Sequence, residues 1–306
     1  MMNIKKIVFV NYACETGGPE CIHQTCSFLT ENGFDASMFY IDGAKQHPSK
    51  FLHYNNKLRQ SLDVDDETLV VFPEIVDLNE IKAVNSIKAI NWLSVDNTKT
   101  TKIVNLDEAL KDAGVEFHFV QSQYARNFLE VYNLKNIFDL PDYTNEKYLE
   151  SRAKKARKPY VLYNPKKGMD FTQKVVYLNK DIKFIPIINM SIDEIIDLMD
   201  ESMVYIDFGN HPGKDRIPRE AICRDLIVIT NFNGSAGNDV DVPIDLKYKV
   251  HSTYNNLRKI SDLLHSCLKN YDVDILNFKR AKETMLAEKE RFKKTTLNVF
   301  NQIVKM

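Results

Sequence analysis

The chain has 306 residues, of which 44% are hydrophobic and 27% are charged, proportions that are typical of a folded globular protein and exclude a wholly disordered chain. Its 41 Lys and Arg residues nearly balance its 42 Asp and Glu residues, so the formal net charge is −1. Because non-specific binding to nucleic acid depends on an excess of positive charge, we do not expect a nucleic-acid partner. At about 150 residues per domain, the length predicts two domains.

No apolar run approaches the roughly 18 residues of a membrane-spanning helix, and the N-terminal segment lacks the cleavage site of a signal peptide. The chain has five cysteines and no Cys-x-x-Cys pair, which favours reduced thiols over a disulfide framework. Cys21, His23 and Cys26 would lie on different faces of a helix, so we expect no metal site there. These features predict a cytoplasmic protein.

The first half of the chain alternates short apolar runs with segments of helical periodicity. Pro19 fits the first position of a helix, and Gly33 fits its end. A further helix is expected at about residues 123–132. The predicted strands are residues 7–11, 36–41, 68–72, 89–95 and 117–121. Continuous apolar strands that are separated by helices are typical of a parallel sheet with both faces covered.

A basic segment, residues 150–159, interrupts this pattern and ends at a proline, and the alternation then starts again. Ser191 and Glu194 form the capping-box pattern at the start of a predicted helix, residues 192–201. The other elements expected in this half are strands 160–163, 183–188, 203–208 and 226–230, and helices 172–178, 218–224, 255–270 and 276–304. We therefore predict an α/β protein with two doubly wound, Rossmann-like domains facing a cleft, residues 1–150 and 151–275, followed by a C-terminal helix, residues 276–306.

Ligands of open α/β sheets bind at the loops that follow the carboxyl ends of the strands. In the loop of residues 14–20, Gly17 and Gly18 would let the backbone approach a ligand at a helix start, although a plain tight turn would use the same residues. This loop matches neither the dinucleotide-binding nor the P-loop pattern. In the loop of residues 163–168, Lys166 and Lys167 suit a phosphate or diphosphate, with a solvated basic loop as the alternative.

The loop of residues 209–221 has the densest set of ionisable side chains, around a helix that we expect to start at Pro218. Arg216 or Lys214 could neutralise a phosphate leaving group, and Glu220, in the first helical turn, could accept hydroxyl groups of a ribose or sugar. An internal network of salt bridges is the alternative. A fourth loop, residues 233–239, has small residues that permit close backbone contact, and a flexible surface loop would have the same composition.

Other candidates are weaker. Asp96 follows strand 89–95 at the expected ligand edge, where a helix cap is the alternative. Residues 152–158 and 279–294 are locally basic, which indicates solvated faces or a weak docking surface for an anionic inner membrane leaflet.

Together, the four loops resemble the GT-B glycosyltransferases, especially the large retaining group that builds bacterial surface polysaccharides. The segment Thr16-Gly17-Gly18 between a strand and a helix looks like part of that family's first β-α-β unit. Residues 120–125 look like its last N-domain strand and the following helix. Pro218-Arg219-Glu220-Ala221 keeps the Pro-x-Glu-Ala form that commonly ends its donor-binding segment.

The resemblance implies a nucleotide-diphosphate sugar as donor, held mainly by the second domain without a bound metal or other cofactor. Glu220 would contact the ribose or nucleotide, and Lys166 or Lys167 with Arg216 or Lys214 would hold the diphosphate. The acceptor would be a glycan, lipid-linked or protein molecule near the first domain. The expected binding residues are Gly17 and Gly18, near the acceptor, and Lys166, Lys167, His211, Lys214, Arg216, Arg219, Glu220 and Ser235. The candidates for a base that deprotonates the acceptor are Asp96, Glu15 and His23.

One position departs from the family pattern. Retaining members often carry two Glu residues separated by seven others, and the residue eight positions before Glu220 is Pro212. The stereochemical outcome therefore stays open, and so do two alternatives, a nucleotide-sugar epimerase or hydrolase and a non-catalytic partner subunit. The partner-subunit alternative predicts an apolar surface on the C-terminal helix, around Phe292, Val299, Phe300 and Ile303.

Overall fold

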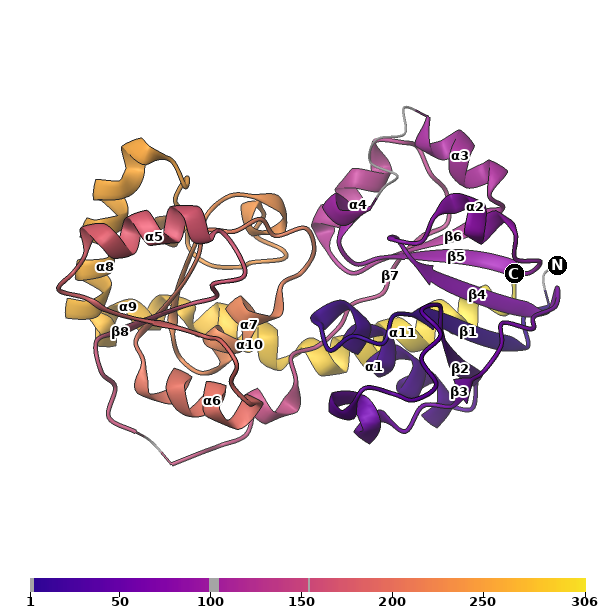
Figure 1. Ribbon diagram of the computed structural model, residues 1–306, viewed down its shortest axis with the longest axis horizontal. Helices are drawn as coiled ribbons and strands as arrows, with labels where there is room; N and C mark the ends of the chain where they lie inside the picture. Colours follow the sequence, from indigo (N-terminus) through magenta and orange to yellow (C-terminus); the bar gives the residue numbers. More distant parts are fainter. Residues whose placement is uncertain (1–2, 99–104, 154) are drawn as a thin grey trace. The chain divides into compact units, whose positions relative to one another are not determined.

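A computed structural model of the protein describes residues 3–98, 105–153 and 155–306 (Figure 1). The chain divides into two compact units, which are described separately. Unit 1 consists of Met1–Tyr143, Pro212–Lys214 and Lys289–Met306, and unit 2 consists of Thr144–His211 and Asp215–Glu288. Within the described residues, no helix is both long and apolar enough to cross a membrane.

Unit 1 is built on a seven-stranded parallel sheet with the strand order β3-β2-β1-β4-β5-β6-β7. The side chains of each strand alternate between the two faces because a strand has a period of two residues. In β1, Ile7 and Phe9 join one core cluster, and Val8 and Val10 join the other. The strands are β1 Lys6–Asn11, β2 Asp35–Tyr40, β3 Leu58–Arg59, β4 Thr68–Pro73, β5 Ile87–Trp92, β6 Val115–Val120 and β7 Ile137–Asp139.

Helices cover both faces of this sheet. Helix α1 (Gly17–Glu31) buries Cys21, Cys26 and Leu29 against one face. Helices α2 (Leu78–Lys82), α3 (Leu106–Asp112) and α4 (Gln123–Glu130) contribute to the core on the other face. The strands and helices predicted from apolar periodicity in this half are therefore present. The short edge strands β3 and β7 were not predicted, because two or three residues are too few to show a period.

Unit 2 contains a four-stranded parallel sheet with the order β11-β10-β8-β9. The predicted capping box at the start of α6 is confirmed, since Ser191 Oγ accepts a hydrogen bond from Glu194 N and the Glu194 carboxylate accepts one from Ser191 N. The strands are β8 Tyr160–Tyr163, β9 Lys183–Pro186, β10 Val204–Asp207 and β11 Ile227–Thr230. The helices are α5 Met169–Leu178, α6 Ile192–Glu201, α7 Arg216–Cys223, α8 Leu257–Lys269, α9 Tyr271–Asp274 and α10 Lys279–Leu286.

The C-terminal segment corrects one prediction. The single helix expected at residues 276–304 is interrupted at Ala287, so that α10 and α11 (Glu288–Ile303) are separate helices. From Lys289 onward the chain belongs to unit 1, and the yellow α11 lies among the indigo elements of that unit in Figure 1.

The apolar residues of α11 do not form a surface patch. The Phe300 ring lies 6.2 Å from that of Phe9 and 5.5 Å from that of Phe119, measured between centroids. Val299 and Ile303 belong to the same core cluster, and Phe292 is 1% exposed. These side chains complete the core on the α1 face of the sheet, so the exposed apolar surface that the partner-subunit alternative predicted is absent from this helix.

Candidate functional site

The carboxyl ends of β8, β10 and β11 bring three loops of unit 2 together. These strands are parallel neighbours in the sheet, so the loops that follow them leave from the same edge. The loops are residues 164–168 after β8, 208–215 after β10 and 231–238 after β11. This is the edge of an α/β sheet at which ligands bind.

Glycines allow the backbones of these loops to touch. Gly168 has a φ of +57°, and a Cβ atom there would lie 2.5 Å from Gly209 N. Gly234 has a φ of +63°, and a Cβ atom there would lie 2.0 Å from the His211 carbonyl oxygen. Both contacts are too short for any side chain, and both backbone conformations favour glycine. The loop after β10 is therefore packed directly against each of the other two.

A buried group of charged side chains joins the same loops. His211 Nδ1 lies 2.7 Å from Asp215 Oδ2, and His211 Nε2 lies 3.5 Å from Asp207 Oδ1. The Lys167 ammonium donates a hydrogen bond to Asp215. Burial alone would lower the pKa of His211, but the close contact with Asp215 and the charges of Asp207 and Asp215 outweigh it, so that the pKa is raised.

The same contacts keep Asp215 ionised. Burial would raise the pKa of its carboxyl group, but the close contact with His211 and the nearby Lys167 charge lower it below its ordinary value. Asp207 is also buried and fully engaged, since it accepts hydrogen bonds from Gly209 N and from the Tyr205 hydroxyl, both at 3.0 Å. An internal network, the alternative weighed for this loop, therefore accounts for His211 and Asp215.

Arg219, one of the residues predicted to bind the donor, makes a buried ion pair within unit 2. Its guanidinium is buried and lies 2.9 Å from the Glu288 carboxylate, whose side chain is also buried. Glu288 also accepts hydrogen bonds from the backbone and hydroxyl of Thr144, at 3.1 and 3.0 Å. Sequence reasoning did not find this pairing, because the partner, Glu288, is 69 residues away in the sequence and nothing local points to it.

The helix that carries Arg219 begins earlier than expected. Asp215 is the N-cap of α7, and Arg216, not Pro218, is its first residue. Glu220 therefore lies in the second turn, not the first, and it is buried to 8% exposure. Arg216 and Glu220 are four residues apart, so they share one face of the helix.

The remaining donor-binding candidates lie in different settings. Lys166 is exposed on the loop after β8, and its backbone N–H binds Asn164 Oδ1. Ser235 is buried, and its backbone N–H donates to the His211 carbonyl at 2.8 Å. Lys214 lies in the short segment Pro212–Lys214, which groups with unit 1. Gly17 and Gly18 also belong to unit 1, in its first segment. A Cβ atom on Gly18 would make only an ordinary 3.4 Å contact with Leu93, so that glycine is not required by packing.

Of the three candidate bases in unit 1, His23 is buried in the interior. His23 is 0% exposed, with Nε2 2.9 Å from the Tyr40 hydroxyl and Nδ1 3.0 Å from Asn56 Nδ2. Burial lowers its pKa to about 3, and the nearby His47 adds to this. Because the ring is enclosed and hydrogen-bonded at both nitrogens, neither nitrogen can reach an acceptor hydroxyl. We therefore do not retain His23 as a base.

The other two candidates stay at the surface. Asp96 is exposed and accepts a hydrogen bond of 2.9 Å from the Tyr124 hydroxyl. Glu15 accepts hydrogen bonds from Ser49 Oγ at 3.0 Å and from Lys50 N at 3.2 Å.

Sequence reasoning missed Glu74, which directly follows β4. Its carboxylate is buried and accepts hydrogen bonds from Ser94 N at 2.7 Å and Leu93 N at 3.2 Å. These bonds end β5 at Trp92, three residues before the predicted end, and form the turn that carries Asp96. Burial raises the pKa of Glu74 to about 7, against the opposing effect of its backbone hydrogen bonds. The available signal was a carboxylate placed immediately after a buried strand.

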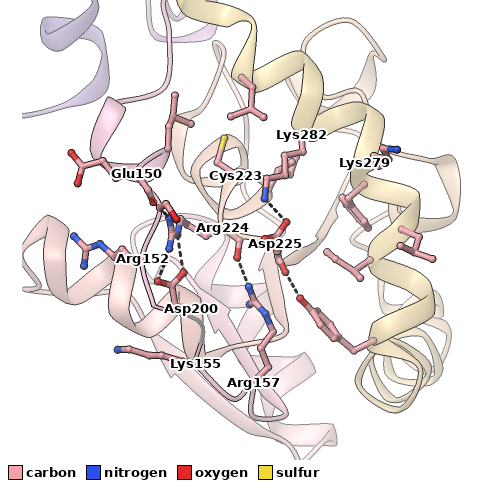
Figure 2. Close-up of a pocket in the computed structure, with 18 of the residues that line it drawn as sticks. Glu150, Arg152, Lys155, Arg157, Asp200, Cys223, Arg224, Asp225, Lys279 and Lys282 are labelled. Carbon is pink, nitrogen blue, oxygen red and sulfur yellow. Dashed lines mark hydrogen bonds and ion pairs between the residues drawn. The ribbon is translucent and has the colours of Figure 1, made fainter.

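A hollow of about 690 Å³ lies elsewhere in unit 2, between residues 149–153, 155 and 157, the C-terminal ends of α6 and α7, and helices α9 and α10 (Figure 2). Several of its charged groups form ion pairs with one another. Arg224 pairs with Asp200, and Lys282 pairs with Asp225, both at 2.5 Å. Arg157 donates to the backbone carbonyls of Met199 and Arg224.

Comparison with known proteins identifies the fold. No family model and no curated protein sequence matches the chain. Among solved structures, a sucrose-phosphate synthase from Thermosynechococcus elongatus superimposes with a TM-score of 0.72 at 11% identity, over 98% of this chain and 99% of that one. HepE from Anabaena, in complex with UDP, gives 0.65 at 12% identity over 98% of both chains. A glycosyltransferase from Rickettsia africae gives 0.66 at 15% identity, over 99% of this chain and 98% of that one.

At this level of identity the likeness shows the fold. The expected fold class is confirmed, since the chain has the two Rossmann-like α/β units of the GT-B glycosyltransferases.

Proposed function

We propose that the protein is a glycosyltransferase that moves a sugar from a nucleotide-diphosphate sugar to a glycan, lipid-linked or protein acceptor. The observation that carries this proposal is the junction of three loops at the carboxyl edge of the unit 2 sheet. Backbone contacts at Gly168 and Gly234 hold these loops together, and cationic side chains accompany them. The full-length likeness to a sucrose-phosphate synthase and to HepE, which was solved with UDP, supports the same conclusion.

The donor diphosphate would bind at the start of α7. The first N–H groups of a helix have no partner within it, and the helix dipole adds partial positive charge at that end. Arg216 is the first residue of α7, and Lys166 is exposed on the neighbouring loop. When the bond between sugar and phosphate breaks, negative charge develops on the diphosphate, and these groups would stabilise it. Glu220, on the same helix face as Arg216, would accept hydroxyl groups of the nucleotide ribose.

The acceptor hydroxyl must lose its proton during transfer. In an inverting reaction Asp96 or Glu15 would act as the base, since both are carboxylates at the carboxyl edge of the unit 1 sheet. In a retaining reaction the leaving phosphate would take the proton, and these residues would only orient the acceptor.

The test is nucleotide binding. A panel of UDP, GDP, dTDP, ADP and CMP is added to the protein, and thermal unfolding is measured. A ligand at about 100 times its dissociation constant adds about 2.7 kcal/mol to the free energy of unfolding, which is readily seen. We expect one nucleoside diphosphate to stabilise the wild type, and we expect Arg216→Ala and Glu220→Ala to lose this effect.

Arg280→Ala is the matched control, because Arg280 is an exposed arginine on α10, in the same unit. It should keep the stabilisation. If no nucleotide stabilises the wild type, the donor site does not exist and a non-catalytic role becomes the better explanation.

A further inference from the structure

His211 occupies an unusual position for a predicted ligand-binding residue. Its side chain is 0% exposed, so it has no surface to offer a donor. Instead, each ring nitrogen lies near a carboxylate oxygen, that of Asp215 at 2.7 Å and that of Asp207 at 3.5 Å. A histidine so placed acts on its surroundings and not on a ligand directly.

The contacts of His211 reach all three loops of the candidate site. Its ring pairs with Asp215, the N-cap of α7, and Asp215 in turn holds Lys167 on the loop after β8. Its backbone carbonyl accepts the Ser235 N–H from the loop after β11 at 2.8 Å. The same carbonyl lies against Gly234, where a Cβ atom would approach it to 2.0 Å. A change in the position of His211 would therefore move the loop after β10 and the start of α7 together.

Two carboxylates close to the ring favour its doubly protonated form. A neutral imidazole has one N–H and one bare nitrogen lone pair, whereas an imidazolium has two N–H groups. Loss of the second proton would place a lone pair against either Asp207 or Asp215, and the facing oxygen and nitrogen would repel each other. The charges also balance in the protonated form, since His211 and Lys167 together match the two aspartates.

We propose that His211 is a positioning residue that, as a buried imidazolium, holds the three loops in the arrangement that binds the donor diphosphate. This inference rests on the proposed function. The groups that face the ring are Asp207 on β10, Asp215 at the start of α7 and Lys167 on the loop after β8. The two aspartates raise the pKa of His211, and burial and Lys167 lower it, with a net rise. Because the folded-state pKa is raised, the ordered arrangement is complete at lower pH and is lost as the pH rises through that pKa.

The first measurement is made without any nucleotide. The imidazole nitrogens of the wild-type protein are followed by NMR as the pH is raised, with the hydrogen exchange of residues 164–168 and 231–238. We expect His211 to keep both ring protons above its ordinary pKa of about 6.5, and we expect exchange in both loops to accelerate when it loses one. Titration at or below 6.5, or exchange that does not follow it, would overturn the proposal.

The second measurement is the dissociation constant for UDP between pH 7 and pH 9.5, a range in which the terminal phosphate stays ionised. We expect the wild-type constant to rise about tenfold across the titration of His211. His211→Gln should bind UDP about tenfold more weakly at pH 7, with a flat pH profile. Equal affinity and an unchanged profile in this variant would refute the positioning role.

His265→Gln is the matched control, because His265 forms an exposed pair with Asp181 at 2.8 Å in the same unit. It should bind UDP as the wild type does. Should the wild type bind none of UDP, GDP, dTDP, ADP and CMP at any pH, the proposed function fails, while the NMR titration and the loop exchange still decide the role of His211. Should His211→Gln not fold, the same two wild-type measurements decide that role without the variant.

Discussion

The buried pair of Arg219 and Glu288 gives the sharpest test of how unit 2 is held together. The two side chains are 2% and 1% exposed, and their charged atoms lie 2.9 Å apart. Replacing Arg219 with Met keeps most of the side-chain volume and leaves the Glu288 carboxylate buried without its cation. Removing one partner of a buried ion pair typically costs about 3–5 kcal/mol, because the remaining charge is no longer compensated.

Glu288 keeps part of its compensation in this variant. The two hydrogen bonds from Thr144 remain, and bonds to a charged group are worth about 1.5–3 kcal/mol each. We therefore expect a loss at the low end of the range, about 3 kcal/mol of a total stability of about 5–15 kcal/mol.

Urea unfolding followed by far-UV circular dichroism measures this loss. Fluorescence of Trp92, the only tryptophan in the chain and a buried residue of unit 1, serves as a second probe. The double variant Arg219→Met with Glu288→Gln removes both charges, and it should lose less than the single variant. A loss below about 1 kcal/mol in Arg219→Met, or a double variant less stable than the single, would refute the reasoning.

Two further substitutions test other parts of the structure. Gly168→Ala should lower the free energy of unfolding by at least about 2 kcal/mol and weaken UDP binding, because its Cβ atom would lie 2.5 Å from Gly209 N at a positive φ. Gly33→Ala is the control, since Gly33 also has a positive φ but a Cβ atom there would meet nothing within 4 Å, and it should cost only about 1 kcal/mol. Equal losses in urea unfolding would contradict the close packing at Gly168. The raised pKa of Glu74, about 7, means that the folded state binds a proton more tightly than the unfolded state does. The free energy of unfolding of the wild type should therefore fall as the pH rises from about 4.5 to 7, and Glu74→Gln should flatten this dependence. An unchanged slope would show that Glu74 does not titrate in this range.

The regular elements were predictable because their signals are local. Strand 160–163 and helix 192–201 appear at the residues that apolar runs and the capping box indicated. Turn residues such as Gly33, which has a φ of +87°, can also be recognised from the sequence. Two parallel sheets then follow from the alternation of strands and helices, and with them the edges at which ligands bind.

The direction of each polar side chain was not predictable, because it depends on partners that are distant in the sequence. His23 and Arg219 look like site residues when only their loops are considered. The buried His23 contacts Asn56, which is 33 residues away, and the buried Arg219 pairs with Glu288, which is 69 residues away. Residue type and spacing carry no record of such pairings, whereas the burial that results from them decides which charges a ligand can reach.

The helical period of α7 explains how one charged segment can both form internal contacts and present side chains to the proposed donor. Asp215 and Arg219 are four residues apart, and the Arg219 Nε–H donates to the Asp215 carbonyl while its terminal nitrogen pairs with Glu288, so this face is internal. Arg216 and Glu220 follow one position later, about 100° around the helix, and form the next face. Placing the helix start at Pro218 obscured this division by treating Arg216 as a loop residue. With the start at Arg216, the 3.6-residue period separates Asp215 and Arg219, which lie on the internal face, from Arg216 and Glu220, which we assign to the donor. Substitution of Arg216 or Glu220 should therefore abolish nucleotide binding.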